Sequence, residues 1–461
     1  MGQTSSITQG VAAFINRTGI DDVPGNVLEI ITTDLLDLVG CVLHGHSLPW
    51  GRAITTFVRE HGKEGAATVW GTDFRRTATD AVLAIGTLGH AFDFDDYHSQ
   101  AKLHAAVAVV PPIIATAEEL DLSGREVMEA LAVGMECMIR LSLAMGPVSA
   151  MKKGFHVTGI CGPFGVAAGL AKLLALPEST TADALGIAAT SASGLFGFIT
   201  EGSDTKRLHP GFAAQRGIQS IALARAGLTG PARALEVVHG GFLTAFSDES
   251  EPERILDGIG RKWATGGISL KRYPTCGGIQ TTTDLVRQAV RDHGAENISS
   301  IQVGHNPATI HQNGQDYHPN DQLTAQMNLK YCVSAVLVEG DLLPAQFREE
   351  MLASPQVLAR VNDVSVIEDA EVASLYPRHP AARVRVTTRS GGVKEYFALG
   401  PKGSPDDPLS RAEVEQKFRG ILPPEFDPDR AGNIIAAAVA VLNLATIRDF
   451  TSHLAVTSAS R

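Results

Sequence analysis

Apolar side chains recur at three- and four-residue steps through the first part of the chain, and this spacing constrains the fold more than any other feature. From residue 27 to residue 42 they fall on one face of a long helix. Ser123 is placed to cap a later helix that carries a similar apolar stripe. Glycine and alanine crowd residues 159–171, so helices there can pack closely. These patterns predict an all-helical domain over residues 1–265.

Strand-like alternation replaces this spacing over residues 266–404. Residues 299–305 alternate as a strand does, and residues 383–398 predict a hairpin with a Ser-Gly-Gly turn. An apolar-periodic helix is expected between these strands, at roughly residues 322–338. This segment is therefore predicted to be a smaller α+β domain.

Helices return after the linker-like sequence PKGSPDDP. Ser410 and Glu413 form a capping box, and Asp427 precedes a proline at the first position of another predicted helix. We therefore expect a mostly α fold: a large helical domain, an α+β lid domain, and C-terminal helices over residues 405–461 that return to the helical domain. A chain of 461 residues is too long for one compact core, in agreement with two domains. Active sites often lie at such domain junctions.

Charge and cysteine usage limit the partners of the chain. The formal net charge of -11 argues against nucleic acid, because a phosphate backbone needs a surplus of lysine and arginine. The five cysteines include no C-x-x-C pair, which is typical of free thiols in a reducing compartment. No apolar run reaches the ~20 residues of a membrane span, and the start MGQTSSITQG lacks a signal-peptide pattern. We expect a cytoplasmic protein that binds neither membrane nor nucleic acid.

Four local clusters of polar residues are candidates for chemistry. The first ends a predicted helix and holds Asp93, Tyr97 and His104 among further acids and a histidine. A solvated helix end and a metal site are the alternatives, but the acids lack standard ligand spacing, so we expect no metal. The second is His156, between glycines just before the glycine-rich helix, whose N-terminal N–H groups could hold a carboxylate. A lone histidine in a loop is more often structural.

The other two clusters are basic. Lys206, Arg207 and His209 form either a solvated turn or a grip for an anion, and they stand out in so acidic a chain. Lys271 lies at the predicted domain junction, where it would face a cleft shared by both domains. Cys276 follows it, but no triad order supports a thiol nucleophile.

Motifs of the common cofactor classes are missing from the sequence. It has neither G-x-G-x-x-G after a strand nor a P-loop, so nucleotide chemistry has no support. The cysteines are too scattered for an iron–sulfur cluster, and the G-x-S-x-G and H-E-x-x-H motifs do not occur. We therefore expect chemistry without a cofactor.

The four clusters together resemble the MmgE/PrpD family. They read DFDDYH…LH, GFH, KRLHPGFAA and K-x-Y-P-x-C, in this order. Members of the family include 2-methylcitrate dehydratase, cis-aconitate decarboxylase and iminodisuccinate epimerase. The resemblance covers essentially the whole chain and implies the same architecture, together with a homodimer. The stretch DDYHSQAKLH is most similar to the fungal cis-aconitate decarboxylase pattern.

The resemblance also implies roles for individual residues. It places six residues on catalytic positions of the family: Asp93, His104, His156, Lys206, Lys271 and Tyr331. Substrate contacts are implied for four more: Tyr97, Arg207, His209 and Cys276. The chain departs from the family at Gln280, where many members have histidine, and at Cys276, where some do.

We therefore expect a cofactor-independent lyase, a decarboxylase or a dehydratase, acting on a small di- or tricarboxylic acid. Lys206, Lys271 and His156 would hold its carboxylates, and ammonium and imidazolium groups would stabilise the charge that develops. His104 would be the general acid/base, and Asp93 would orient and charge an imidazole or a lysine rather than react. The alternatives are an epimerase of an iminodisuccinate-like diacid, using the same proton abstraction, and a non-catalytic binding protein that kept the fold.

Overall fold

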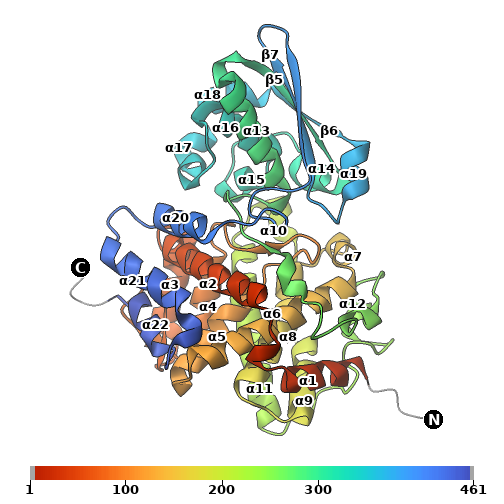
Figure 1. The fold of residues 1–461 in the computed structure, drawn as a ribbon, viewed down its shortest axis with the longest axis vertical. Coiled ribbons are helices and arrows are strands. Elements are labelled where there is room, and N and C mark those ends of the chain that lie inside the picture. Colours follow the sequence, from red (N-terminus) through yellow and green to blue (C-terminus); the bar gives the residue numbers. More distant parts are fainter. Residues whose placement is uncertain (1–5, 457–461) are drawn as a thin grey trace. The chain divides into compact units, whose positions relative to one another are not determined.

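The computed structural model describes residues 6–456 and divides the chain into two compact units (Figure 1). Unit 1 takes the chain up to Ile268 and again from Ser410 onward, and unit 2 takes Ser269–Leu409. The expected fold class, mostly α with a small sheet, is confirmed. No helix within residues 6–456 is both long and apolar enough to cross a membrane. Residues 1–5, which include the start of the stretch read for a signal peptide, lie outside the described part.

Unit 1 is built from helices of the N-terminal part and three helices of the C-terminal part. The N-terminal helices are α1 (Ile7–Arg17), α2 (Gly25–Gly45), α3 (Pro49–His61), α4 (Ala78–Gly89), α5 (Ala106–Leu120), α6 (Gly124–Met145), α7 (Pro147–Lys152), α8 (Val157–Leu173), α9 (Glu178–Thr190), α10 (Gly197–Glu201), α11 (Thr205–Arg225) and α12 (Phe242–Phe246). The C-terminal helices are α20 (Arg411–Ile421), α21 (Pro428–Val439) and α22 (Arg448–Leu454). Short strands β1 (Ala67–Thr68), β2 (Arg75–Arg76) and β3 (Tyr97–His98) lie between them, and β4 (Ile268–Ser269) is where the chain passes into unit 2.

Close helix packing forms the core of unit 1. Helix α8 packs against α5, α6 and α11, and α11 packs against α4. A Cβ atom added at Gly165 of α8 would lie 2.5 Å from the Cβ of Met138, and one at Gly86 of α4 would lie 2.8 Å from the backbone nitrogen of Gly211. Only glycine allows such approach, so the crowding of small residues in the sequence reflects packing, as interpreted.

The predicted helix starts are confirmed. Ser123 caps α6 and Ser410 caps α20, each in a capping box with the glutamate three residues later. Asp427 accepts a backbone hydrogen bond at the start of α21, with proline at the first helical position.

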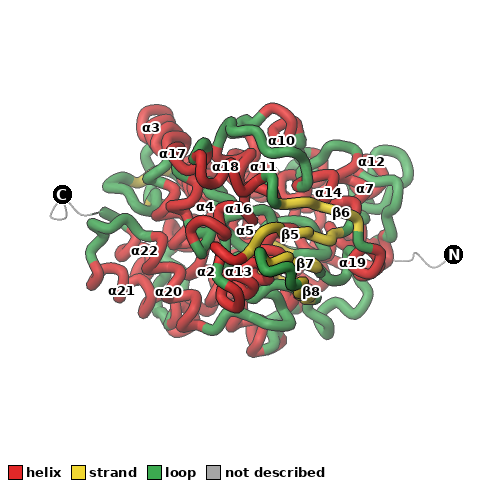
Figure 2. The backbone as a smooth tube through the Cα atoms, turned by 90° about the horizontal axis from the view of Figure 1, so that it is seen from above, coloured by secondary structure: helices red, strands yellow, loops and turns green. Residues whose placement is uncertain are grey.

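Unit 2 contains a four-stranded mixed sheet in the order β6-β5-β7-β8 (Figure 2). Its strands are β5 (Ile298–His305), β6 (Val364–Glu368), β7 (Ala382–Thr388) and β8 (Val393–Ala398), and only β5 and β6 are parallel. Its helices are α13 (Gln280–His293), α14 (Pro307–Asn313), α15 (Gln322–Gln326), α16 (Leu329–Glu339), α17 (Glu349–Leu352), α18 (Pro355–Val361) and α19 (Ala370–Leu375). Helices α13 and α16 pack on the sheet.

The strand and hairpin predictions are confirmed, but the single helix predicted over residues 322–338 is wrong. The structure has two helices there, because the side chain of Asn328 accepts the backbone N–H of Tyr331 and starts a new helix. An asparagine at this position competes with the helix interior for backbone hydrogen bonds.

A buried ion pair joins the C-terminal helices to the N-terminal ones. Lys417 of α20 lies 2.7 Å from Asp37 of α2, and both side chains are almost fully buried. The same ammonium donates a hydrogen bond to the carbonyl oxygen of Phe94, 2.8 Å away, and lies over its ring. One lysine therefore anchors α2, α20 and the loop that follows α4.

Replacing Lys417 by methionine should lower the free energy of unfolding by about 3–5 kcal/mol, because Asp37 would be left buried without its counter-charge. The exposed pair of Lys153 and Asp248 gives a matched control. Lys153→Met should cost less than about 1 kcal/mol. Chemical denaturation of both variants checks this, and equal losses would contradict it.

Candidate active site

The loop between α4 and α5 folds back on itself and carries most of the candidate site. His90 ends α4, and Asp93 takes a left-handed backbone conformation with φ 54°. Asp96 closes the loop, because one of its oxygens accepts the backbone N–H groups of Ala105 and Ala106 at 2.9 and 3.4 Å. A left-handed aspartate costs energy and persists only where the surroundings hold it, which these hydrogen bonds do.

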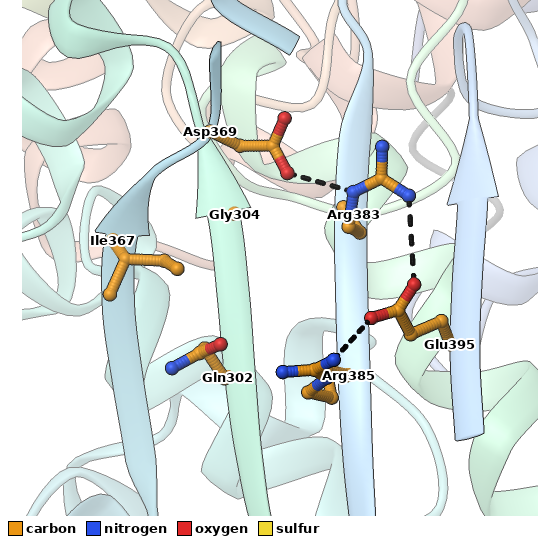
Figure 3. A pocket seen from close by; sticks show the side chains of 7 residues that line it. All are labelled: Gln302, Gly304, Ile367, Asp369, Arg383, Arg385 and Glu395. Carbon is orange, nitrogen blue, oxygen red and sulfur yellow. Dashed lines mark hydrogen bonds and ion pairs between the residues drawn. The ribbon is translucent and has the colours of Figure 1, made fainter. Parts of the chain in front are cut away.

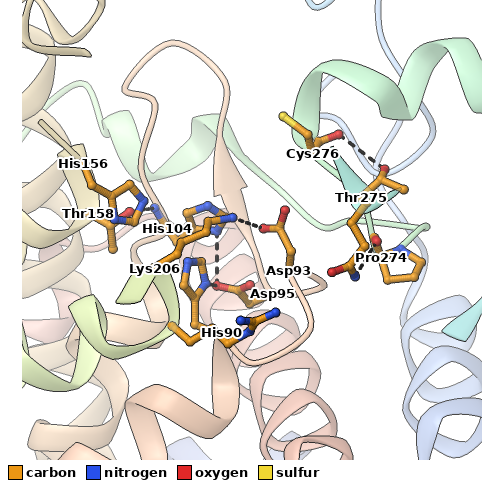
Figure 4. A network of polar contacts seen from close by, with 12 residues as sticks. His90, Asp93, Asp95, His104, His156, Thr158, Lys206, Pro274, Thr275 and Cys276 are labelled. Carbon is orange, nitrogen blue, oxygen red and sulfur yellow. Dashed lines mark hydrogen bonds and ion pairs between the residues drawn. The ribbon is translucent and has the colours of Figure 1, made fainter. Parts of the chain in front are cut away.

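Asp95, in the same loop, lies between two imidazoles and accepts a hydrogen bond from each (Figure 4). Its Oδ2 lies 2.8 Å from Nδ1 of His90 and 3.1 Å from Nδ1 of His104. Burial alone would raise the pKa of Asp95, but the two imidazoles hold it well below the usual range. Asp95 is therefore an ionised carboxylate inside the protein.

The hydrogen bonds of His104 define which of its nitrogens is available. Nδ1 also lies 2.6 Å from the backbone carbonyl oxygen of Asp96, which can only accept. Nδ1 therefore carries a hydrogen, and Nε2 is the nitrogen that can take or give a proton. The His104 side chain is 12% exposed, whereas His90 is fully buried. His104 is thus the imidazole of this pair that a small molecule can reach.

Two further segments of unit 1 bring side chains to the same place. His156 precedes α8, and its ring centroid lies 6.5 Å from that of His104. Its Nδ1 lies 2.8 Å from Nδ1 of His209 on α11. Lys206, one turn earlier on α11, lies 2.8 Å from Asp93 and is nearly buried. Three of the four stretches expected to converge therefore do so; the fourth, with Lys271, belongs to unit 2.

The imidazolium groups expected at His156 and His209 are neutral imidazoles in the structure, and His90 is neutral as well. Burial lowers the pKa of His90 and of His209 to about 4, and lowers that of His156 well below its usual value. Neighbouring histidines and Lys206 act in the same direction. These rings are neutral near pH 7, so the ammonium of Lys206 supplies the positive charge of this cluster.

The remaining predicted residues of unit 1 have structural partners. Arg207 donates to the carbonyl oxygen of Ala91, pairs with Asp204 and lies 3.8 Å above the ring of Trp50. It thereby holds the loop after α4 against α11. Tyr97 is buried in β3.

The predicted residues of unit 2 are mostly buried, and Tyr331 has a hydrogen-bond partner inside that unit. Lys271 and Tyr331 are buried, and the Tyr331 hydroxyl donates to the carbonyl oxygen of Gln346. Cys276 is partly exposed. The Gln280 side chain accepts the backbone N–H of Tyr273 at 3.2 Å and donates to its carbonyl oxygen at 2.8 Å. Where many members of the resembled family have histidine, this chain thus uses an amide to fix the turn after Lys271.

Sequence reasoning missed His90 and Asp95 as site residues. Asp95 was visible only as one acid in an acidic run, and His90 as a helix residue. A histidine five residues before an aspartate at a helix end was the available signal, but its meaning depends on the loop folding back.

Two sets of side chains in the described part have the spacing of metal ligands. One is His90, His104 and His156, and the other is His90, Asp93, Asp95 and His104. In each set, one ligand atom per residue lies within 4.8 Å of the others.

A hollow on the sheet of unit 2 is lined by Arg383, Arg385 and other residues (Figure 3). Arg383 pairs with Asp369 at 2.7 Å, and Arg385 pairs with Glu395 at 2.9 Å. Since both guanidinium groups are already neutralised by carboxylates, this surface is a poor anion site.

Comparison with known proteins gives matches over most of the chain. The model of the MmgE/PrpD N-terminal domain matches residues 9–255, and that of the C-terminal domain matches residues 273–443. The chain is 29% identical to a cis-aconitate decarboxylase-like protein of Aspergillus oryzae, over 98% of this chain and 97% of that protein. It is 28% identical to a cis-aconitate decarboxylase of Aspergillus terreus, over 98% and 95%. It is 24% identical to a 2-methylcitrate dehydratase of Cupriavidus necator, over 88% of each.

Buried carboxyls lie behind the site. Both oxygens of Asp34 on α2 are buried without a hydrogen-bond partner among residues 6–456. Burial and the nearby charge of Asp96 raise the pKa of Asp34 well above its usual value. Burial and Asp95 raise that of Asp96 to about 7. Above the ordinary pKa of aspartate, Asp34 and Asp96 therefore stay protonated in the folded chain but lose their protons in the unfolded chain.

Because the folded state binds more protons at these carboxyls, their contribution to stability falls as pH rises above the ordinary aspartate range toward about 7 and beyond. Asp34→Asn cannot ionise, so its stability relative to the unmodified chain should grow from about pH 5 to about pH 8. Denaturant titrations at each pH measure this. Asp21→Asn removes an exposed carboxyl and should show no such growth. A gain for Asp34→Asn that does not change with pH would contradict the assignment.

Proposed function

This chain belongs to the MmgE/PrpD family, and we propose that it is a lyase that removes carbon dioxide or water from a small di- or tricarboxylic acid without a bound cofactor. Decarboxylation of a cis-aconitate-like acid is the more specific proposal. It is supported by relatives named for that activity, which match the chain over nearly its whole length.

One observation carries the proposal. His104 has Nδ1 fixed by Asp95 and by the carbonyl oxygen of Asp96, while Nε2 is available on the partly exposed side of the ring. This is the arrangement of a general acid/base whose orientation and protonated form are supported by a buried carboxylate. Lys206 lies in the same cluster as a cation, and a substrate carboxylate would compete with Asp93 for its ammonium group.

The proposed decarboxylation uses these two groups. The bond to the departing carboxylate breaks, and its electron pair moves toward a neighbouring unsaturated carboxylate. The ammonium of Lys206 stabilises the charge on that carboxylate, in a site where little water screens it. His104, protonated beforehand from solvent, then delivers its Nε2 proton to carbon, and Asp95 stabilises the imidazolium until the transfer.

In a dehydration the same groups would act, but His104 would accept a proton from carbon instead of donating one. Neutral His104 would take a proton from the carbon next to a carboxylate, and a hydroxyl group would leave from the adjacent carbon. An epimerase of an iminodisuccinate-like diacid would stop after the proton exchange. The products separate the three reactions.

Other expectations from the sequence stay predictions. Lys271, Cys276 and Tyr331 of unit 2, and His209 of unit 1, are assigned to the reaction or to substrate binding by family resemblance. We also propose a homodimer on the same basis, and a cytoplasmic location on the basis of the scattered cysteines.

Incubation with cis-aconitate, 2-methylcitrate, citrate and iminodisuccinate, followed by proton NMR in deuterated buffer, tests the function. We expect loss of carbon dioxide from the cis-aconitate-like acid, with one deuteron incorporated at carbon. A new double bond with loss of water would indicate a dehydratase. Deuterium exchange without a new product would indicate an epimerase, and no reaction with any of the four acids would contradict the proposal.

Replacing His104 by glutamine should lower kcat by ~10²–10⁴-fold, because a positioned general acid contributes about that much to the rate. The exposed His239 offers a matched control, and His239→Gln should leave kcat unchanged. Steady-state kinetics of the purified variants, with circular dichroism to confirm folding, check the result. Near-normal turnover by His104→Gln would remove this residue from the mechanism.

A further inference from the structure

Three histidines of unit 1 share one arrangement, which the proposed reaction requires only at His104. Each ring uses Nδ1 for a partner inside the protein: Asp95 for His90 and for His104, and His209 for His156. The nitrogen left over on each ring is Nε2. Nε2 of His90 is buried and has no hydrogen-bond partner among residues 6–456. A buried imidazole nitrogen without a partner is costly, unless something absent from the chain itself occupies it.

The three rings also lie close enough to share one ligand. His90, His104 and His156 each offer one ring nitrogen, and these atoms all lie within 4.8 Å of one another. The ring of His90 lies 4.5 Å from that of His104 and 6.0 Å from that of His156, between ring centroids. Figure 4 shows the three side chains gathered from the loop after α4 and the start of α8.

The surroundings of the rings match those of imidazoles that hold a transition metal. Such histidines usually donate Nδ1–H to a carboxylate or a carbonyl oxygen, which orients the ring and makes Nε2 a better ligand. Asp95 does this for two rings at once, and the carbonyl oxygen of Asp96 does it for His104. Three imidazoles bound to one ion leave its fourth tetrahedral position open to water or to a substrate carboxylate.

We propose that His90, His104 and His156 form a binding site for one divalent transition-metal ion of the zinc type. Magnesium and calcium prefer oxygen ligands and do not suit a set of three nitrogens. The second set, with Asp93 and Asp95 in place of His156, is less suitable, because Asp93 is paired with Lys206 and Asp95 with two imidazoles.

Metal binding at this site inhibits the enzyme rather than assisting it. The ion takes the lone pair of His104 Nε2, which is the position of the proton that the reaction exchanges. Metal and proton therefore compete for one nitrogen. This consequence for turnover rests on the proposed function, whereas the binding of the ion does not.

Titration of the chelator-stripped full-length protein with cobalt(II) tests the site directly. We expect the intense visible absorption of four-coordinate cobalt, saturating at one equivalent and abolished by one equivalent of zinc. His90→Gln should abolish it, and Asp95→Asn should weaken cobalt binding by about 10–100-fold through loss of the carboxylate that orients two rings. His239→Gln, which alters an exposed histidine, should bind cobalt as the unmodified protein does.

Absence of the cobalt absorption in the unmodified protein would overturn the proposal, as would equal affinity in His90→Gln. Asp95→Asn gives an independent reading if His90→Gln does not fold. Zinc should also inhibit turnover reversibly, with full recovery after addition of a chelator. Cobalt absorption without turnover of any tested acid would leave the metal site standing and overturn the proposed function, while turnover without cobalt absorption would do the reverse.

Discussion

An ionised carboxylate buried between two imidazoles is the interaction on which the rest of the site depends. Asp95 lies within hydrogen-bonding distance of His90 and His104, and it remains charged in spite of its burial. Removing a carboxylate from water is costly, so its two hydrogen bonds must be kept, and both rings are thereby held in one orientation. The free nitrogen of each ring faces away from Asp95 as a consequence.

The electrostatics of the site differ from what residue types alone suggest. Several histidines and a lysine near each other in an acidic chain indicate a cationic site, but burial makes three of the four histidines neutral. The positive charge of Lys206 is itself balanced by Asp93. The net charge of these side chains therefore changes only when a ligand or a proton binds. This property suits acid–base chemistry, and it equally suits competition between a proton and a metal ion.

Much of the fold followed from local sequence patterns. The starts of α6, α20 and α21 were predicted because their capping residues act within one turn, and β5, β7 and β8 because their side chains alternate. The break between α15 and α16 was missed, since the capping role of Asn328 is visible only when the helix before it has ended. Strand β6 was missed because its short run of residues pairs with β5 from a distance in the chain. His90 and Asp95 were missed for a similar reason: their meeting requires the loop closed by Asp96.

The contact between Gly86 and Gly211 has a consequence for how such a site can change during evolution. These glycines let α4 and α11 touch at the backbone, and the two helices carry His90 and Lys206 respectively. A single methyl group added at either position would wedge the helices apart and move whole groups of reactive atoms together. The geometry of the site therefore depends on residues that lie outside it, at the contact between the two helices.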